Sequence, residues 1–328
     1  MTIIFLRVTF IMYFHDYSKE EKEAIAKELK NYSLDVCIKD YHKLQEGFNA
    51  GLDTIAPLSL VGIKFIEHFI YPELLNTKIK QGFSFYDFWG NKDFYLTRDA
   101  STKKLIEYIK TEKPKLNEIK RAKKVFNLYY GSVNVFRPTI AIRLYEMFKP
   151  TCVLDFTMGW GGRLVGACIA GVKEYIGVDC NTNLKEPYQK MCDQLQKISP
   201  NTTARLFFDD CLKIDYTTLQ YDMVFTSPPY YNKELYGGDQ TGKTEKEWNE
   251  EFYIPIFNKT WASLAPGGHY CLNVPAQLYA NLCIPIFGPA EQEVELKKFS
   301  RTLPSHETKR KNVGQKYKEY IYIWSKQI

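Results

Sequence analysis

The sequence predicts an α/β protein with a doubly wound, Rossmann-like sheet and a mainly helical N-terminal region. From Pro150 onward, short apolar runs typical of buried parallel strands alternate with helix-compatible segments. The first run is followed by a glycine-rich turn, as expected where a strand leads into a helix. The chain has 328 residues, of which 45% are hydrophobic and 25% charged, and this composition excludes global disorder.

Six apolar runs are the expected strands of the sheet. The first four should be parallel, and they cover residues 152–155, 175–179, 205–209 and 221–226. Two more follow over residues 270–274 and 319–324. Helix-compatible segments connect the first three runs and cover residues 162–171 and 184–198. Strands that alternate with helices in this way form a sheet with helices on both faces.

The pattern of the sequence changes near residue 130, from helices and connections to alternating strands and helices. We expect residues 1–130 to form a mainly helical region and residues 131–328 to form a second domain. A helix should begin at Ser18, where Ser-Lys-Glu-Glu resembles a capping box. The stretch from Lys103 to Lys124 holds nine Lys or Arg against three Glu, an excess equal to the whole chain's net charge of +6. Such a run forms either a solvated helix face or a contact surface for nucleic-acid phosphates.

Eight cysteines stand singly along the chain, with no C-x-x-C pair. This pattern argues against a zinc site and against the disulfide framework of a secreted protein, and it favours an intracellular, cytoplasmic protein of a host cell or a virion. Residues 1–14 are apolar, but they are interrupted by Arg7 and are too short to cross a bilayer. They form either a first strand or an extension upstream of a start at Met12. We expect neither a membrane partner nor a metal.

A glycine-rich turn follows the first strand, with the sequence Asp155-Phe-Thr-Met-Gly159-Trp-Gly161-Gly162. Glycines let the backbone turn sharply and approach a ligand closely, and ligands of open parallel sheets bind beyond the carboxyl ends of the strands. The spacing differs from G-x-G-x-x-G, so the turn need not cradle a nucleotide phosphate. Asp179 closes the second strand, 20 residues after Gly159, where it could accept hydrogen bonds from ribose hydroxyls.

The tetrad Ser227-Pro228-Pro229-Tyr230 directly follows the fourth strand. Two prolines fix φ at both positions and remove two N–H donors, which leaves local carbonyls free to accept hydrogen bonds from another group. With a polar side chain before the prolines and an aromatic ring after them, the tetrad can form a binding site that accepts hydrogen bonds from an amine and stacks a flat base. A rigid strand-exit turn is the structural alternative.

Together the two motifs resemble the amino-group DNA methyltransferases that use S-adenosylmethionine, whose hallmark is (D/N/S)-P-P-(Y/F/W). The resemblance covers residues 131–328 and implies a seven-stranded sheet with one antiparallel strand, which residues 320–324 could supply. Asp155, Gly159 and Gly161 match the glycine loop that binds the cofactor. Gly267-Gly268 matches the "P-G-G" turn that precedes a late strand of the family.

The resemblance also assigns cofactor contacts outside the glycine loop. Phe136, Arg137 and Pro138 resemble the segment that closes over the methionine end of the cofactor. Asp179 matches the acid that holds the ribose, and Asp210 resembles the residue after the third strand that contacts the adenine.

The implied activity is site-specific transfer of a methyl group to an exocyclic amine of a DNA base, as in DNA methylation and restriction-modification. Ser227 and the Pro228 carbonyl would hold the amine, Pro229 would fix the turn, and Tyr230 would stack on a base flipped out of the duplex. Positioning supplies most of the rate, so neither a strong base nor a metal is required.

The identity of the base stays open between two alternatives. Serine at the first tetrad position is typical of cytosine-N4 enzymes, whereas the order of glycine loop before tetrad is commoner among adenine-N6 enzymes. Tyr231, Glu234 and Tyr236 follow the tetrad and could line the base pocket or lie in a solvated loop.

Two other functions compete with DNA methylation: methylation of an RNA base, because some RNA enzymes share the tetrad, and a catalytically silent binding subunit. Only about 70 residues separate glycine loop and tetrad, so a target-reading part must lie elsewhere. The candidates are residues 1–130 and the basic segment Lys309–Lys318, which reads as a hairpin arm.

Overall fold

The computed structural model describes residues 16–56, 58–97, 100–231, 234–235 and 243–296, together with residues 319–327. The sequence predictions for residues 1–14, for Tyr236 and for residues 309–318 lie outside these ranges, as does the side chain of Glu234. The chain falls into two compact units. Unit 1 comprises Met1–Asn31 and Leu74–Val133, and unit 2 comprises Tyr32–Glu73 and Asn134–Ile328.

Unit 1 is mainly helical in its described residues. Its elements are α1 (Lys19–Leu29), β1 (Lys78–Ile79), α4 (Phe85–Gly90), α5 (Lys92–Thr97), α6 (Ala100–Glu112), α7 (Glu118–Val125) and the π-helix η2 (Phe126–Tyr130). The capping box predicted at Ser18 is confirmed, because Ser18 Oγ accepts from the Glu21 N–H and the Glu21 carboxylate accepts from the Ser18 N–H.

Aromatic rings form the core of unit 1. Phe83 stacks on Tyr95 with ring centroids 4.7 Å apart, and Phe88 and Phe126 pack edge to face at 5.3 Å. The aromatic segment that follows Gly82 therefore supplies a hydrophobic core, and such pairs add to the stabilisation from burial alone.

Unit 2 is built on a seven-stranded sheet. Its strands, in the order in which they pair, are β4 (Thr203–Phe207), β3 (Glu174–Val178), β2 (Cys152–Asp155), β5 (Tyr221–Thr226), β7 (Leu264–Val274), β9 (Glu319–Ser325) and β8 (Gln292–Leu296). The first five are mutually parallel, and β9 is antiparallel to both neighbours. All six expected strands are present, and the predicted doubly wound, methyltransferase-type fold is confirmed.

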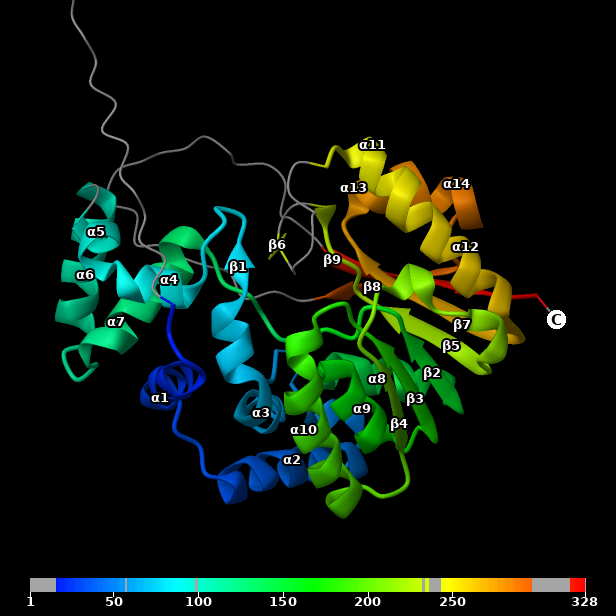
Figure 1. Ribbon diagram of the computed structural model, residues 1–328. Helices are drawn as coiled ribbons and strands as arrows, with labels where there is room; N and C mark the ends of the chain where they lie inside the picture. The colour runs from blue at the N-terminus through cyan, green and yellow to red at the C-terminus, as the bar shows by residue number, and fades with distance from the viewer. Residues whose placement is uncertain are drawn as a thin grey trace, which may run out of the picture. The chain divides into compact units, whose positions relative to one another are not determined.

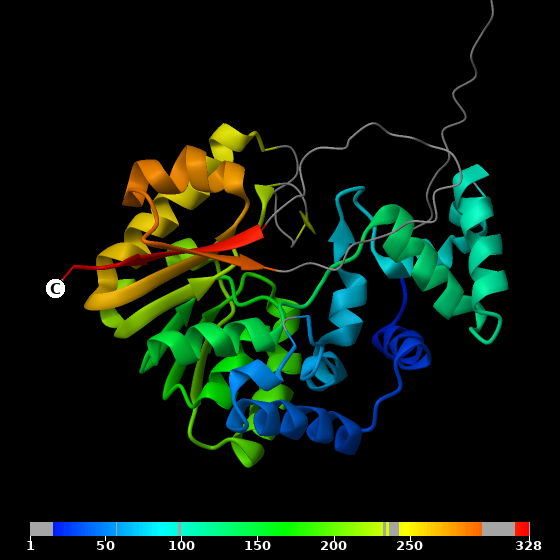
Figure 2. The same cartoon turned by 180° about the vertical axis from the view of Figure 1, so that it is seen from behind.

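Helices cover both faces of this sheet (Figures 1 and 2). The helices of unit 2 are α2 (Leu34–Asn49), α3 (Ile63–Asn76, which continues into unit 1), α8 (Pro138–Phe148), α9 (Gly162–Ala170), α10 (Lys185–Ile198), α11 (Glu245–Trp248), α12 (Ile254–Ser263), α13 (Ala276–Leu278) and α14 (Ile284–Phe287). Short 3₁₀ and π segments extend or connect them: η1 (Leu52–Thr54), η3 (Thr182–Leu184), η4 (Cys211–Lys213), η5 (Tyr216–Thr218), η7 (Asn249–Tyr253) and η8 (Tyr279–Cys283). The two-residue strand β6 (Glu234–Leu235) follows the tetrad.

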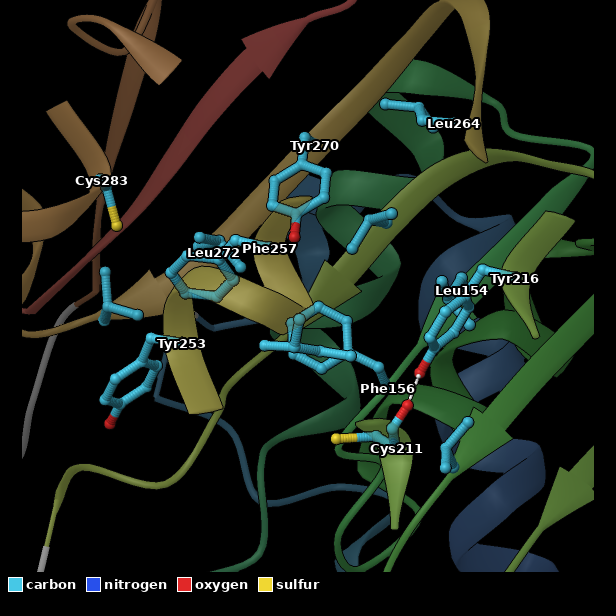
Figure 3. Close-up of a cluster of buried hydrophobic side chains, with 14 of the residues drawn as sticks. Leu154, Phe156, Cys211, Tyr216, Tyr253, Phe257, Leu264, Tyr270, Leu272 and Cys283 are labelled. Atoms are coloured by element: carbon cyan, nitrogen blue, oxygen red, sulfur yellow. Dashed lines mark hydrogen bonds between the residues drawn. The ribbon is translucent and has the colours of Figure 1, made fainter. Parts of the chain in front are cut away.

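One large hydrophobic cluster lies between the sheet and the helices around α12 (Figure 3). Leu154 of β2 and Tyr270 and Leu272 of β7 meet Phe257 of α12, and all four are fully buried. Burial of such side chains stabilises the fold by about 1.5–3 kcal/mol each. The core therefore holds the strand ends of the sheet in fixed positions.

The helical segment Tyr32–Glu73 belongs to unit 2, whereas the sequence groups it with the N-terminal region. The reason is a set of contacts that no local pattern reveals. Arg143 of α8 donates to the carbonyls of Leu52 and Ile55 at 2.8 and 2.7 Å, and Gln45 of α2 donates to the Ile169 carbonyl at 3.5 Å. The second boundary, at Val133, lies close to the change of pattern near residue 130.

Gly267 and Gly268 lie inside β7, not in a turn before a strand as the resemblance implies. The register between β5 and β7 shifts here, from Tyr221↔Leu264 to Met223↔His269. A Cβ at Gly268 would stand 2.6 Å from the Asp222 carbonyl oxygen, and Gly267 has φ +75°. The two glycines thus form an irregularity that lets the strands approach closely.

Candidate active site

The carboxyl ends of β2, β3, β4 and β5 lie at one edge of the sheet, because these four strands are parallel and adjacent. The predicted site residues stand at or just after these ends: Asp155 closes β2, Asp179 follows β3, Asp210 follows β4 and Ser227 follows β5. The structure therefore brings the glycine loop, the two outer acids and the tetrad to the same edge, where ligands of open sheets bind.

The glycine loop between β2 and α9 has free space beside Gly159 and tightly packed backbone beside Gly162. Gly159 and Gly161 have φ +58° and +91°, values that side chains other than glycine rarely adopt. A Cβ at Gly159 would meet only the Thr157 carbonyl oxygen, at 3.9 Å, so space adjoins the loop there. A Cβ at Gly162 would stand 1.8 Å from the Phe136 carbonyl oxygen, so Gly162 permits direct backbone packing.

Asp155 is fully buried and is bonded entirely within the protein. Its carboxylate accepts from Arg163 Nε at 2.6 Å and Nη2 at 3.1 Å, from the Tyr175 hydroxyl at 2.5 Å and from Thr226 Oγ1 at 2.8 Å. Arg163 is buried as well and donates to the Thr157 carbonyl at 2.5 Å. Asp155, which the resemblance assigns to the cofactor, therefore holds the glycine loop and does not present free oxygens to a ligand.

Asp179 is half-buried, and its carboxylate is not paired with a cation in the described part of the chain. Its two oxygens accept the N–H groups of Gly159 and Asn181, each at 2.9 Å. Burial raises the pKa of the Asp179 carboxyl to about 6, although the two N–H donors oppose the shift. Each oxygen keeps a further lone pair for a hydroxyl donor, so this acid fits the ribose role.

Asp210 and the start of α8 occupy their expected positions beside the edge. Asp210 is half-buried and caps η4 by accepting from the Leu212 N–H at 2.9 Å.

Arg137 precedes α8 and Pro138 is its first residue, as suits a ring that lacks an N–H. Burial lowers the pKa of the Arg137 guanidinium, and the charge of Glu319 opposes the shift. The Phe136 ring lies 5.1 Å from the Arg163 guanidinium.

The tetrad leaves one of its two proline carbonyls unoccupied. The Tyr253 hydroxyl donates to the Pro229 carbonyl and accepts from the Tyr231 N–H at 3.2 Å. No residue in the ranges that the structure covers donates to the Pro228 carbonyl, the one expected to bind the amine. Tyr231 has φ +52°, a strained value for tyrosine of the kind that collects at functional sites.

The tetrad and the glycine loop are joined directly. Thr226 Oγ1, one residue before Ser227, lies 2.5 Å from Thr157 Oγ1, two residues before Gly159. Ser227 and Tyr230 are both half-buried, and their hydroxyls lie 3.2 Å apart. The Tyr230 hydroxyl also reaches Asn273 and Glu319, so its ring is held toward the ends of β7 and β9.

Several residues of this edge are missed by the sequence argument. Arg163, Thr226 and Tyr253 carry no motif of their own, and Asn273 and Glu319 lie in strands that read as plain apolar runs. Their partners are 6 to 89 residues away in the chain. A polar residue in an otherwise apolar strand, such as Asn273 in Cys-Leu-Asn-Val, was the one local signal.

The described residues contain no group of three or more His, Cys, Asp or Glu side chains that could hold a metal ion. Within the same residues, no helix is both long enough and apolar enough to cross a membrane.

Comparisons with known proteins give structural likenesses only. No family model matches the chain, and no curated protein matches it. Among solved structures, it is similar to TrmN from Thermus thermophilus (18% identity, TM-score 0.37, 58% of this chain and 49% of that one). It is also similar to an rRNA methylase from Streptococcus thermophilus (14%, 0.34, 60% and 100%). A third likeness is to a SAM-dependent O-methyltransferase from Thermotoga maritima (12%, 0.36, 62% and 70%).

The chain spans about half the length of TrmN. At TM-scores below 0.4, these likenesses assign neither a substrate nor a site residue.

The buried pair of Asp155 and Arg163 yields a stability prediction. Arg163→Met should lower the free energy of unfolding by about 3–5 kcal/mol, because it leaves the Asp155 charge buried without its cation. Urea unfolding followed by circular dichroism measures the change. The control is Lys190→Met, which removes an exposed pair with Glu186 and should change stability little. Equal effects of the two substitutions would contradict the role given to Asp155.

Proposed function

We propose that this protein transfers a methyl group from S-adenosylmethionine to an exocyclic amine of a nucleic-acid base. The observation that supports this most is that the Pro228 carbonyl, which has no hydrogen-bond donor among the described residues, adjoins the glycine loop. The Pro228 carbonyl has no donor among the described residues, and the Thr157–Thr226 contact joins its strand end to the start of the glycine loop. An amine held at Pro228 would therefore lie beside whatever the loop binds.

The residues at the strand ends fit the proposed cofactor. Asp179 would accept from the ribose hydroxyls, and Asp210 would contact the adenine. The space beside Gly159 would admit the methionine moiety, close to Phe136, Arg137 and Pro138. Gly161 supports the same loop, and Tyr188 fixes it by donating to the Gly159 carbonyl at 2.9 Å. When bound, S-adenosylmethionine supplies an electrophilic methyl group on a sulfonium that leaves readily.

The tetrad would prepare the acceptor amine. The lone pair of an exocyclic amine is delocalised into the base ring, so the amine is a weak nucleophile. Acceptors at Ser227 Oγ and the Pro228 carbonyl would take its two N–H groups and aim the lone pair outward. Pro229 fixes the turn, and Tyr230 supplies an aromatic ring beside it. Positioning at about 3–3.5 Å can supply most of the rate without a strong base.

We propose DNA as the substrate, with adenine N6 and cytosine N4 as the candidate atoms and with the base flipped out of the duplex. RNA is the second candidate, because RNA enzymes that methylate base amines share the tetrad. A catalytically silent binding subunit is the third. Tyr231 would line the base pocket, together with Glu234 and Tyr236 of the following segment.

Isotope-labelled methyl transfer tests these candidates in one experiment. The protein is incubated with labelled S-adenosylmethionine and duplex DNA, single-stranded DNA or RNA, and the products are digested to nucleosides for mass spectrometry. We expect N6-methyladenine or N4-methylcytosine in DNA. Pro228→Ala should lower turnover far more than cofactor affinity, because it frees the turn that holds the acceptor carbonyl.

Label in RNA alone would favour the RNA enzyme. Nucleic-acid binding without transfer to any substrate would contradict the enzymatic function and favour the binding subunit. Equal losses of turnover and cofactor affinity in Pro228→Ala would mean that the tetrad is structural.

The raised pKa of Asp179 predicts how cofactor binding depends on pH. Above about pH 6 the carboxylate is ionised and accepts from hydroxyls; below it the group becomes protonated, and affinity should fall up to about tenfold per pH unit. Calorimetric titration with S-adenosylmethionine between pH 5 and 8 measures this. Asp179→Asn should bind more weakly and without that dependence, whereas Asp209→Asn at an exposed neighbour should keep the profile. A flat profile for the unaltered protein would contradict the ribose assignment.

We also propose that unit 1 contacts the phosphates of the nucleic acid. Unit 1 carries 18 Lys and Arg against 11 Asp and Glu, whereas unit 2 carries 26 against 27, so the positive excess of the chain resides in unit 1. Within α6, α7 and their connection, six lysines have no acidic partner among the described residues: Lys103, Lys104, Lys113, Lys115, Lys120 and Lys124. Lysines of this kind act as point charges toward phosphates.

Charge reversal tests the phosphate contact. Lys113→Glu combined with Lys115→Glu should weaken binding to DNA and reduce the slope of log affinity against log salt by about 0.9 for each phosphate that is no longer neutralised. The matched control reverses Lys173 and Lys197, two exposed lysines of unit 2. Fluorescence anisotropy at several salt concentrations measures both, and equal slopes for the two variants would contradict the proposal.

A further inference from the structure

Four polar side chains, two of them from the tetrad, form a cluster at the ends of β5, β7 and β9. Ser227 Oγ lies 3.2 Å from the Tyr230 hydroxyl, 3.2 Å from Asn273 Oδ1 and 3.4 Å from the Asn273 carbonyl oxygen. The Tyr230 hydroxyl lies 3.1 Å from each of these Asn273 oxygens and 2.9 Å from Glu319 Oε1. Asn273 is only 2% exposed.

The orientation of the Asn273 amide follows from its other contact. Asn273 Nδ2 donates to the Tyr320 carbonyl at 3.0 Å. A backbone carbonyl can only accept, so the amide nitrogen must face Tyr320, and Oδ1 must face the two hydroxyls.

A count of protons shows what the cluster does to Ser227. The two hydroxyls carry one proton each. Among the described residues they face three oxygens that accept: the Asn273 carbonyl oxygen, Asn273 Oδ1 and the carboxylate oxygen Glu319 Oε1. Acceptors therefore outnumber protons, so each of the two protons has an acceptor within the cluster. The remaining lone pairs of Ser227 Oγ are left to accept from a group outside it.

This distinction matters for the amine that the proposed function places at Ser227. A serine hydroxyl can donate as well as accept, and a proton aimed at the amine nitrogen would occupy the lone pair that must attack the methyl group. The other residues found at the first position of the tetrad are aspartate and asparagine. The oxygens of an ionised aspartate, and the side-chain oxygen of an asparagine that faces the amine, carry no proton and can only accept.

We propose that Asn273 and Glu319 are positioning residues that hold the Ser227 and Tyr230 protons and thereby make Ser227 an acceptor toward the target amine. This inference rests on the proposed function. It also assigns a specificity: the pocket selects a base with an amino group over its keto counterpart, because a keto oxygen needs a donor where the cluster presents an acceptor.

Turnover in two backgrounds tests the role of Asn273. Asn273→Leu should lower kcat about tenfold or more, with an unchanged Kd for S-adenosylmethionine. In a Ser227→Asn background, whose amide oxygen carries no proton, the same substitution should cost less than about threefold. An equal loss in both backgrounds would mean that Asn273 is merely structural and would overturn the proposal, as would no loss in the unaltered background.

Glu319 gives a second test that does not depend on the buried Asn273. Glu319→Leu should lower kcat in the same way, whereas the matched control Glu293→Leu, at an exposed position of β8, should not. Equal kcat values for the Glu319 and Glu293 variants would overturn the role of Glu319.

Binding supplies a readout besides turnover. Oligonucleotides carrying the target base or its keto counterpart (hypoxanthine for adenine, uracil for cytosine) are compared by fluorescence anisotropy. The unaltered protein should prefer the amino base, and Asn273→Leu and Glu319→Leu should reduce that preference several-fold, because the freed hydroxyl can donate to the keto oxygen. An unchanged preference would overturn the inference alone. Absence of any methyl transfer by the unaltered protein would instead remove the proposed function, and the inference with it.

Discussion

The buried carboxylate of Asp155 joins four elements of the sheet unit, and the candidate site depends on that junction. One residue at the end of β2 binds Arg163 of α9, Tyr175 of β3 and Thr226 of β5. A buried ion pair of this kind offers little net stability over an apolar packing, but it is costly to break and strongly directional. It therefore fixes where the glycine loop leaves β2 relative to the point where the tetrad leaves β5. Together with the Thr157–Thr226 contact, it sets the separation between the glycine loop and the tetrad.

Three acids stand at or just after the ends of three neighbouring strands, and their surroundings give them different roles. Asp155 is buried with a cation and two hydroxyls, so its charge is neutralised inside the protein. Burial raises the pKa of Asp179 against two backbone N–H donors that lower it, and each of its oxygens keeps a spare lone pair. Asp210 caps a short helix at the surface of the edge. Sequence position alone makes all three look like ligand contacts, and only the environment separates the one that holds the loop from the two that can face a ligand.

The sequence could predict features that depend on a few neighbouring residues, but not contacts between residues far apart in the chain. Strand ends, the capping box at Ser18 and the positive φ values at Gly159 and Gly161 follow from periodicity and backbone sterics within a few residues. The placement of residues 32–73 on the sheet unit does not, because it depends on Arg143 reaching carbonyls about 90 residues away. The same holds for Asn273 and Glu319, which contact the tetrad from 46 and 89 residues away. Contacts of that range arise from strand order, which no single segment encodes.

The serine of the tetrad shows why such distant partners belong to the chemistry of the site. A hydroxyl is indifferent between donating and accepting, so its role is set by its neighbours and not by its own identity. In a tetrad that begins with an ionised aspartate, the carboxylate can only accept a hydrogen bond from the amine. In a tetrad that begins with serine, surrounding oxygens must bind the hydroxyl proton so that it is not donated to the amine. In this chain those oxygens come from β7, which is parallel to β5, and from β9, which is antiparallel to it. The antiparallel strand β9 thus has a chemical consequence as well as a structural one, since it carries a carboxylate that accepts a hydrogen bond from the Tyr230 hydroxyl.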